Sequence, residues 1–561
     1  MYRDTRLDRL ARWFIFGIHN LRLVSHIARG RILPGWELPR VLMCAIGDRH
    51  LEHVTALKPS GTPAHSSSNF AFIIINITLI VAACTIFVYF RWDDLSNWDV
   101  RTYAFAAIDF TSHPRLYERA YVDKPPLAVL MFLPMAFLPT VAGPAIFFAM
   151  VIIIEALLLR RLLLLLGFDE AACLGGVALL LTDTTLKYQL DYVSLSHLTN
   201  LLILGACTAA NKGKIRGIII SGVLIGASFY IRQNNVIFAL YPLILGRLTV
   251  FRLLAIYTIS MLTSLLFLLG LFCLISDVPL LLYTIFAYPF KYADVSVGGR
   301  PPTAVAETAL FFGILSLKPL LLFVVVWCVA ALTGARPPVS GRQMVLLFAV
   351  GFIAMVAPRK EFWHYQGYLL IWLGLLGAWS VEILVPRFLR HRQSLLVCLA
   401  AGCAVALVVA VAGIEAGLRQ KIASAKDRLN LIMPEIEKAR SSRPGHPTLQ
   451  VFEPVYDEHG ISDALILALT DAKTSTPLFA TVFFADWFSF ALPPPFRSQW
   501  GLLAKSPPDV VVLIDLASGG SVGVDFARSV NAFLDSHGYR VRRIADDVAI
   551  SERPNPASAI K

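Results

Sequence analysis

The sequence has little charge and little cysteine, and each shortage excludes a class of protein. Only 16% of its 561 residues are charged, against 57% that are hydrophobic, whereas a soluble protein carries roughly 25% charge. Much of the surface must therefore face something other than water. The eight cysteines show no metal-type spacing, and none lies in residues 416–561. A disulfide framework in that last part of the chain is excluded.

Strand-like alternation is also missing from the apolar parts of the chain. The apolar residues form blocks of about twenty, which is the length that crosses a hydrocarbon core of roughly 30 Å. Because lipid offers no hydrogen-bonding partners, such blocks must be helices. The sequence predicts an all-α polytopic membrane protein with about eleven transmembrane helices. The predicted spans are Phe70–Phe90, Val141–Leu159, Ala171–Thr184, Leu198–Ala210, Gly217–Tyr230, Val236–Leu245, Leu253–Ile275, Ala306–Leu332, Met344–Val356, Leu369–Val385 and Leu395–Ile414. The short, proline-bounded stretch Pro125–Leu138 is predicted to lie at the membrane surface.

The net charge of +12 is distributed in a way that argues against nucleic acid as a partner. Basic residues recur in the short connections on one side of the predicted membrane, and this bias marks the cytoplasmic side. These connections contain Arg160/Arg161, Lys212/Lys214/Arg216, Arg247/Arg252, Arg336/Arg342 and Arg387/Arg390/Arg392. The basic N-terminus is thereby placed inside, and an odd number of spans places the C-terminus outside. We expect a bacterial inner membrane protein with a periplasmic C-terminal part.

This orientation divides the chain into three parts. Residues 1–69 form a basic cytoplasmic segment, which is either an amphipathic helix on an anionic leaflet or a loosely ordered tail. No cleavable signal peptide is expected, because His19, Asn20 and Arg22 interrupt its only candidate stretch. Residues 70–415 form the transmembrane domain, and residues 416–561 form a small soluble domain.

The soluble domain is predicted to be α/β, because strand-like and helical patterns alternate along it. No glycine-rich phosphate loop occurs in it, so we expect it to serve packing or to handle an acceptor. The predicted helices are Arg419–Arg440, Ser462–Asp471 and Val524–His537, and the predicted strands are Leu449–Val455, Leu478–Phe484, Val510–Leu516 and Tyr539–Ile544.

Polar clusters gather on the outer side of the predicted membrane. In the first outer loop, Asp99 and Tyr103 are four residues apart and share a face if the segment is helical. Lys124 in the same loop precedes a Pro-Pro pair, which imposes an extended backbone. Three further outer clusters are Arg232–Asn235, Asp277–Pro302 and Arg359–Tyr365. Their cations oppose the positive-inside trend, and a lipid-linked phosphate is the ligand that fits them best. Glu155 lies inside a predicted span and requires a partner, which the sequence does not identify.

Two of these clusters carry a resemblance to a known family. Asp99 with Tyr103-Ala104, followed by Lys124-Pro125-Pro126-Leu127, resembles the first-loop motif of the integral-membrane C-type (GT-C) glycosyltransferases. The nearest branches are the aminoarabinose/protein-mannosyl transferases and the polyprenyl-phosphate-mannose-dependent mannosyltransferases. His364-Tyr365 is similar to an outer motif of the same group, and the resemblance covers roughly Phe70 to Val385. One departure is Val100, because many relatives carry a second acid there.

The resemblance implies a donor sugar on a polyprenyl phosphate and a lipid, glycan or protein acceptor. Asp99 would be the general base, with Asp93 and Asp94 as alternatives, and the anomeric centre would be inverted. Lys124, Arg232 and Arg359 would bind the donor phosphate, and Tyr103, His364 and Tyr365 would line the pocket. No cofactor is required and no metal ligands are assigned. A divalent cation remains open, although Val100 weakens the case for one held by paired acids.

Other interpretations remain for these residues and for the chain. Asp99 can cap an interfacial helix, and Lys124 can extend to lipid headgroups. A lipid-linked glycan flippase or transporter would need charges near mid-bilayer and two related halves, but no internal repeat is visible. A polyprenyl-diphosphate glycan ligase would depend on outer arginine and histidine rather than on Asp99. A sensor on a membrane anchor would not need eleven spans.

Overall fold

The computed structural model describes most of the chain between Trp98 and Pro554. The described ranges are 98–187, 195–246, 251–293, 305–359, 363–388, 425–443, 447–452, 463–470, 491–514, 520–546 and 548–554, with single residues between 75 and 88 and at 423, 474, 476, 478 and 484. All of them belong to one compact unit, Ser67–Lys561. Asp93 and Asp94 and the predicted span Leu395–Ile414 lie outside the described residues, as does most of Phe70–Phe90.

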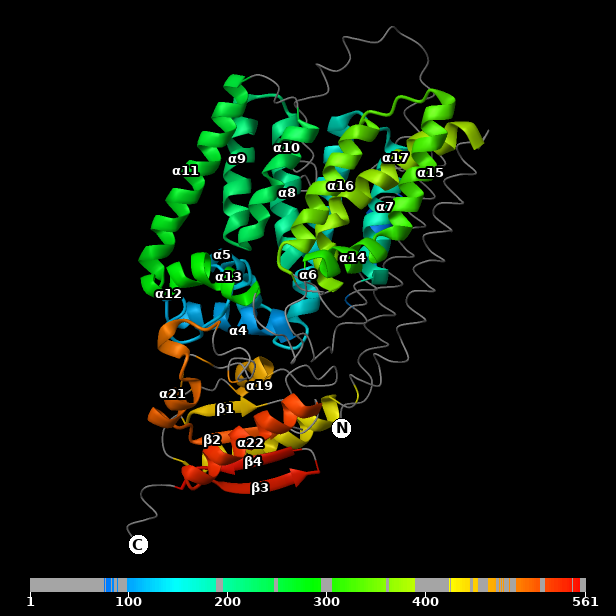
Figure 1. Ribbon diagram of the computed structural model, residues 1–561. Helices are drawn as coiled ribbons and strands as arrows, with labels where there is room; N and C mark the ends of the chain where they lie inside the picture. The colour runs from blue at the N-terminus through cyan, green and yellow to red at the C-terminus, as the bar shows by residue number, and fades with distance from the viewer. Residues whose placement is uncertain are drawn as a thin grey trace, which may run out of the picture. The chain divides into compact units, whose positions relative to one another are not determined.

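The described chain is mostly helical and carries one small sheet (Figure 1). The helices that precede the soluble domain are α4 (Trp98–Ser112), α5 (Pro126–Leu130), η3 (Leu133–Phe137), α6 (Gly143–Leu166), α7 (Glu170–Lys187), α8 (Leu195–Asn211), α9 (Ile215–Phe229), η4 (Gln233–Ala239), α10 (Leu240–Leu245), α11 (Phe251–Ile275), α12 (Val278–Leu282), η5 (Tyr283–Ala287), α13 (Tyr288–Ala293), α14 (Val305–Leu315), α15 (Leu317–Thr333), α16 (Gly341–Val356), η6 (Trp363–Leu369) and α17 (Leu370–Phe388).

Two helical stretches of the described chain are long and apolar enough to cross a membrane, Phe251–Ile275 and Tyr365–Leu384. Their mean hydropathies are 2.3 and 1.6. A third crossing results if α14 and α15 act together as one bent span. Shorter apolar helices coincide with most of the other predicted spans. The protein is a polytopic helical membrane protein, and the count of about eleven spans stays a prediction.

The predicted span Ala306–Leu332 is not one continuous helix. α14 and α15 meet at an angle of 61°, with Ser316 between them. Pro319 lies in the first turn of α15 and has no backbone N–H to donate to Leu315, and its ring crowds that carbonyl group. The proline therefore ends one helix and starts another. Proline has a similar effect in Pro125–Leu138, which forms the two short helices α5 and η3, the second with Pro134 in its first turn.

α11 and α17 occupy opposite environments. In the most apolar window of α17, 83% of the residues are buried, against 11% in that of α11. The indole N–H groups of Trp372 and Trp379 in α17 donate to the carbonyls of Met344 and Val339. α11 packs mainly along α9, where Gly222 leaves room for the Tyr257 carbonyl: an added Cβ would lie 2.5 Å from that oxygen. α17 is thus a core helix, and α11 a peripheral one with an apolar surface suited to lipid.

The soluble domain contains a four-stranded sheet with the order β1-β2-β4-β3. Its strands are β1 (Leu449–Phe452), β2 (Val510–Ile514), β3 (Arg540–Ala545) and β4 (Val548–Glu552), and its helices include α19 (Asp463–Thr470), α21 (Gln499–Lys505) and α22 (Gly520–Ser536) (Figure 1). β1 and β2 pair in parallel, and the pairs of β4 with β2 and β3 are antiparallel. The predicted α/β character is confirmed, and residues 425–441 are helical as expected. β4 was not predicted, and most of the predicted strand Leu478–Phe484 lies outside the described residues.

Candidate functional site

α4 carries the first part of the predicted site. Asp99 and Tyr103 both lie in this helix, one turn apart, as the sequence predicts. Tyr103 is buried, and its ring lies 5.7 Å from that of Phe132. Only the backbone position of Asp99, second in the helix, is described. That position is one turn before Tyr103, on the same side of α4.

The loop after α4 is fixed by backbone hydrogen bonds to distant segments. The Leu116 N–H donates to the Ile275 carbonyl at the end of α11, and the Asp277 N–H donates to the Leu116 carbonyl. Further along, the Ala128 N–H donates to the Tyr230 carbonyl after α9. These bonds place the segment after α4 against the ends of two helices that are far away in the sequence.

Tyr117 closes this loop on itself. Its backbone has a φ of 70°, a left-handed conformation that is uncommon for a bulky residue. Burial raises the pKa of its phenol well above the usual value, and Tyr121 and Asp123 add to the shift. The phenol therefore stays protonated and donates to the Lys124 carbonyl at 2.8 Å. The strained backbone at Tyr117 is thus compensated by a bond that positions Lys124.

Arg232 is a buried cation surrounded by phenol groups. Its side chain is only 7% exposed, and its guanidinium lies 5.0 Å from the centre of the Tyr365 ring. The same guanidinium contacts the hydroxyl of Tyr368 at 3.3 Å. Tyr103 is close enough to interact with it electrostatically. Within the described residues, no acidic side chain forms an ion pair with Arg232, and its Nε atom has no hydrogen-bond partner. We name Arg232, Tyr103, Tyr365 and Tyr368 the arginine cluster; it unites three residues that the sequence assigned to the site.

The geometry of η6 explains the two tyrosines of this cluster. In a 3₁₀-helix, side chains three residues apart eclipse each other, and Tyr365 and Tyr368 are three apart in η6. Their rings are nearly parallel, with an interplanar angle of 10° and centroids 6.2 Å apart. One face of η6 therefore offers Arg232 both an aromatic ring and a hydroxyl group.

The three residues after Arg232 each bond to a different element. Gln233 donates to the Thr284 carbonyl in η5, and Asn234 donates to the Ala354 carbonyl in α16. Asn235 donates to the hydroxyl of Thr199 in α8 at 2.8 Å. The predicted polar cluster Arg232–Asn235 is therefore a junction between helices, and the junction fixes the backbone from which Arg232 extends.

Lys124 lies in a different electrostatic environment. Its ammonium group is 2.5 Å from a carboxylate oxygen of Asp123 and lies over the rings of Tyr288 and Tyr292. The Tyr288 hydroxyl donates to the same carboxylate oxygen at 2.7 Å. Burial and the charge of Asp123 raise the pKa of Tyr288, so this phenol stays protonated and keeps donating. We name Asp123, Lys124, Tyr288 and Tyr292 the lysine cluster. Pro125 is extended, with a ψ of 158°, and α5 begins at the next residue, as the Pro-Pro pair predicted.

The remaining predicted residues are placed less fully. Arg359 follows α16 with a φ of 55° and a half-buried side chain. His364 lies in η6 next to Tyr365, and only its backbone position is described. The described residues contain no group of three or more acids, histidines or cysteines arranged to hold a metal ion.

The sequence did not identify three residues that the structure brings to these clusters, which are Tyr368, Asp123 and Tyr288. His197 is the unidentified partner of Glu155, with its Nδ1 atom 2.7 Å from the carboxylate. The three-residue spacing of Tyr365 and Tyr368 predicts that their side chains lie together only if the segment is known to be a 3₁₀-helix. Asp123 adjoins Lys124 in the sequence, so its charge was visible but its pairing was not.

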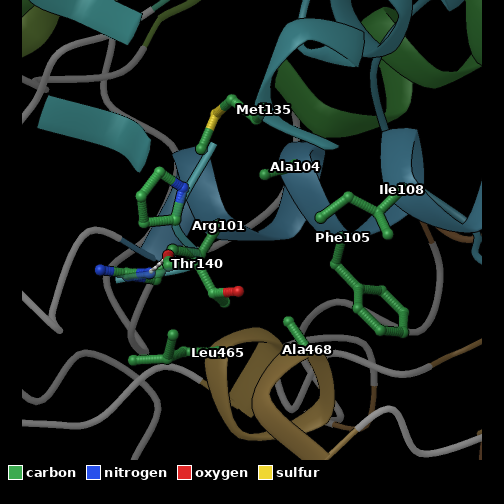
Figure 2. A pocket seen from close by; sticks show the side chains of 9 residues that line it. Arg101, Ala104, Phe105, Ile108, Met135, Thr140, Leu465 and Ala468 are labelled. Carbon is green, nitrogen blue, oxygen red and sulfur yellow. Dashed lines mark hydrogen bonds between the residues drawn. The ribbon is translucent and has the colours of Figure 1, made fainter. Parts of the chain in front are cut away.

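A small pocket lies between α4 and α19 of the soluble domain. It is lined mainly by apolar side chains, including Phe105, Met135 and Leu465. Figure 2 shows the Arg101 side chain extending beside Thr140, with α19 on the opposite wall. The buried Arg101 guanidinium donates to the carbonyls of Thr140 and Val141. The walls of this pocket come from α4, the segment around η3, and α19. No residue of the arginine cluster lines it.

Comparison with solved structures identifies the fold. ArnT from Cupriavidus metallidurans bound to undecaprenyl phosphate matches with a TM-score of 0.52 and 12% identity, over 87% of this chain and 98% of that chain. The apo state of the same ArnT matches with a TM-score of 0.53 and 13% identity, over 86% and 98% of the two chains. The apo oligosaccharyltransferase from Archaeoglobus fulgidus matches at 0.41 and 13% identity, over 79% and 70%, which is too distant to carry an argument. No protein-family model and no curated protein matches the sequence significantly.

These findings define a class. The chain has the fold of the integral-membrane C-type glycosyltransferases, and the resemblance seen in the first-loop motif is confirmed at the level of the fold. The ArnT structures are the matches that carry this conclusion.

Proposed function

We propose that the protein is a glycosyltransferase that moves a sugar from a polyprenyl-phosphate donor to an acceptor at the outer face of the membrane. Three lines of support meet here: the C-type fold, the binding of undecaprenyl phosphate by ArnT of the same fold, and the arginine cluster. The single observation that carries the proposal is the environment of Arg232.

A buried cation without a counterion is unfavourable, because its desolvation is not compensated. Arg232 is buried, and the described side chains next to its guanidinium are phenols rather than carboxylates. An anionic ligand would supply the missing charge. A guanidinium can also bind a phosphate group through two parallel hydrogen bonds. The free Nε atom provides one donor for such a bond.

Lys124 and Arg359, the other two residues predicted to bind the phosphate, have secondary roles. The charge of Lys124 is already balanced by Asp123, so Lys124 offers a donor group with little net charge. Arg359 lies at the exit of α16 and would attract the phosphate by longer-range electrostatics. Arg232 would then carry most of the stabilisation as the phosphate leaves, in a site of low dielectric.

The chemistry is a single displacement. Asp99 accepts the proton of the acceptor hydroxyl as that oxygen attacks the anomeric carbon. The new C–O bond forms while the bond from the anomeric carbon to the phosphate oxygen breaks. The electron pair leaves with the polyprenyl phosphate, and the anomeric configuration is inverted. Tyr103, His364 and Tyr365 would line the sugar and phosphate pocket, and no step requires a metal ion.

The charge of the site favours a monophosphate donor over the alternatives. A diphosphate-linked glycan brings more negative charge, and in the described residues Arg232 is the buried cation with no acid beside it while Lys124 is paired. A ligase that uses polyprenyl diphosphate is therefore less well supported. A flippase would need two related halves, and no internal repeat is visible in the sequence.

The topology of this proposal follows the charge pattern. About eleven spans connect a cytoplasmic segment, residues 1–69, to a periplasmic domain, residues 416–561. The membrane is a bacterial inner membrane, and the acceptor is a lipid, a glycan or a protein. The Tyr283 hydroxyl donates to the Ala491 carbonyl, and this contact supports a soluble domain that lies beside the outer loops and helps to bind an acceptor.

The test is label transfer from a panel of polyprenyl-phosphate sugars in purified membranes. Wild type is compared with Asp99→Asn and Arg232→Ala, and Arg443→Ala serves as the control because Arg443 pairs with Asp509 in the soluble domain. We expect transfer by wild type and the control, and its loss in both site variants at normal expression. Equal transfer by Asp99→Asn would remove Asp99 as the base. No transfer from any polyprenyl-phosphate sugar would overturn the proposed donor class.

A further inference from the structure

A buried polar network lies behind the arginine cluster. Glu155 of α6 and His197 of α8 are 0% and 1% exposed, and His197 Nδ1 lies 2.7 Å from a Glu155 carboxylate oxygen. Asn200 is three residues after His197 on the same face of α8, and its side chain is also close to Glu155. An ionisable pair at such a position usually serves function rather than stability alone.

The same turn of α8 bonds to both segments that form the arginine cluster. Asn200 donates to the Gly367 carbonyl at 2.9 Å, and that carbonyl belongs to the peptide unit preceding Tyr368. Thr199 accepts from Asn235 at 2.8 Å, and Asn235 lies three residues after Arg232. The turn His197–Asn200 therefore holds η6 on one side and η4 on the other. Arg232 directly precedes η4, and Tyr365 and Tyr368 lie in η6.

From this arrangement we infer that Glu155 and His197 are positioning residues for the anion site. Their contact fixes the turn His197–Asn200 of α8. This turn determines the distance between Arg232 and the η6 tyrosines. The ligand part of this inference rests on the proposed function, since the anion would be the phosphate of the donor lipid. The structural part does not depend on any ligand.

The first measurement is hydrogen–deuterium exchange of the full-length protein in detergent. In His197→Ala we expect backbone exchange in 363–369 and 233–239 to rise about tenfold, because the buried contact between His197 and Glu155 is lost. The matched control is Glu170→Gln. It removes the 2.6 Å ion pair between Arg160 of α6 and Glu170 of α7, which does not bond to η6 or η4. Unchanged exchange in both segments, or an equal rise throughout the helices, would overturn the inference.

The second measurement is the affinity for undecaprenyl phosphate. We expect His197→Ala and Asn200→Ala to weaken binding about tenfold while the control binds normally. His197→Gln keeps a side-chain N–H donor and should restore most of the affinity, which a general loss of stability would not allow. If wild type binds but all variants bind equally, the inference fails. If wild type does not bind, the proposed function fails, and the exchange measurement still decides the structural part. Should His197→Ala not fold, Asn200→Ala provides both readouts.

Discussion

The arginine cluster and the lysine cluster each contain a cation, but the surroundings of the two cations differ in charge. Lys124 has a carboxylate 2.5 Å away and two tyrosine rings beneath it. Among the side chains that the structure describes, those around Arg232 are phenols. Within this part of the chain, the lysine cluster contains its own counter-charge and the arginine cluster does not. The role of a basic residue in a motif therefore depends more on the charge of the neighbouring side chains than on whether the residue is lysine or arginine.

The largest effect is expected from Arg232→Ala. Removing the only donor fork of the arginine cluster should lower kcat/KM for sugar transfer by at least about 100-fold, because charge-assisted hydrogen bonds to the leaving phosphate are lost. Arg232→Lys should recover only part of this, since an ammonium lacks the planar fork. Steady-state kinetics with a labelled donor measures both. Full activity of Arg232→Ala would contradict the assignment of the arginine cluster as the main phosphate-binding site.

Lys124→Gln should have a smaller effect, about tenfold in kcat/KM. Because Lys124 and Asp123 balance each other, adding Asp123→Asn to Lys124→Gln should cost less than the product of the two single effects. A double-mutant cycle in the transfer assay gives this coupling. If the two effects on kcat/KM multiply, Lys124 and Asp123 act independently and their ion pair does not contribute to activity.

Tyr368→Phe tests the hydroxyl that contacts Arg232. Loss of one hydrogen bond should raise the dissociation constant for undecaprenyl phosphate about threefold to tenfold, because the guanidinium is less well oriented. Binding of the lipid to detergent-solubilised protein measures this. Tyr292→Phe is the control, since the ring of Tyr292 rather than its hydroxyl faces Lys124. A larger change in the control would contradict the assignment.

The smallest effect is expected from Tyr288→Phe. It removes the hydroxyl that donates to Asp123 at 2.7 Å but leaves the lysine–carboxylate contact in place. Transfer activity should fall by no more than about threefold. A loss as large as that of Arg232→Ala would show that the lysine cluster, and not the arginine cluster, is the main binding site.

The sequence predicted the class of fold well because blocks of apolar residues and the placement of charge depend only on composition along the chain. The condition under which Asp99 and Tyr103 share a face, a helical segment, is met in α4, and the predicted stretch Pro125–Leu138 begins its first helix at Pro126. The sequence did not predict β4, whose residues Val548–Glu552 are too short and mixed to stand out from a loop. Nor did it predict the bend at Ser316, although Pro319 was visible, because the span was judged by hydropathy alone.

The candidate site was predicted in part, for a physical reason. Arg232 and Tyr365 were identified because charged and aromatic residues at the outer ends of apolar blocks are unusual. Their contact depends on how η4 and η6 are brought together by α8, which is a matter of tertiary packing. The pairings of Glu155 with His197 and of Lys124 with Asp123 likewise follow from the folded backbone. One sequence shows which groups need partners but not which partners they find.

The segment that follows α4 is attached to the rest of the protein through main-chain atoms. This affects which substitutions the attachment tolerates. The bonds from Leu116 to Ile275 and from Ala128 to Tyr230 join peptide groups, which every residue type except proline can provide as donors. Such attachments place almost no demand on side chains. Non-proline substitutions at Leu116 or Ala128 should therefore leave these two main-chain bonds in place, and proline at either position should remove one of them.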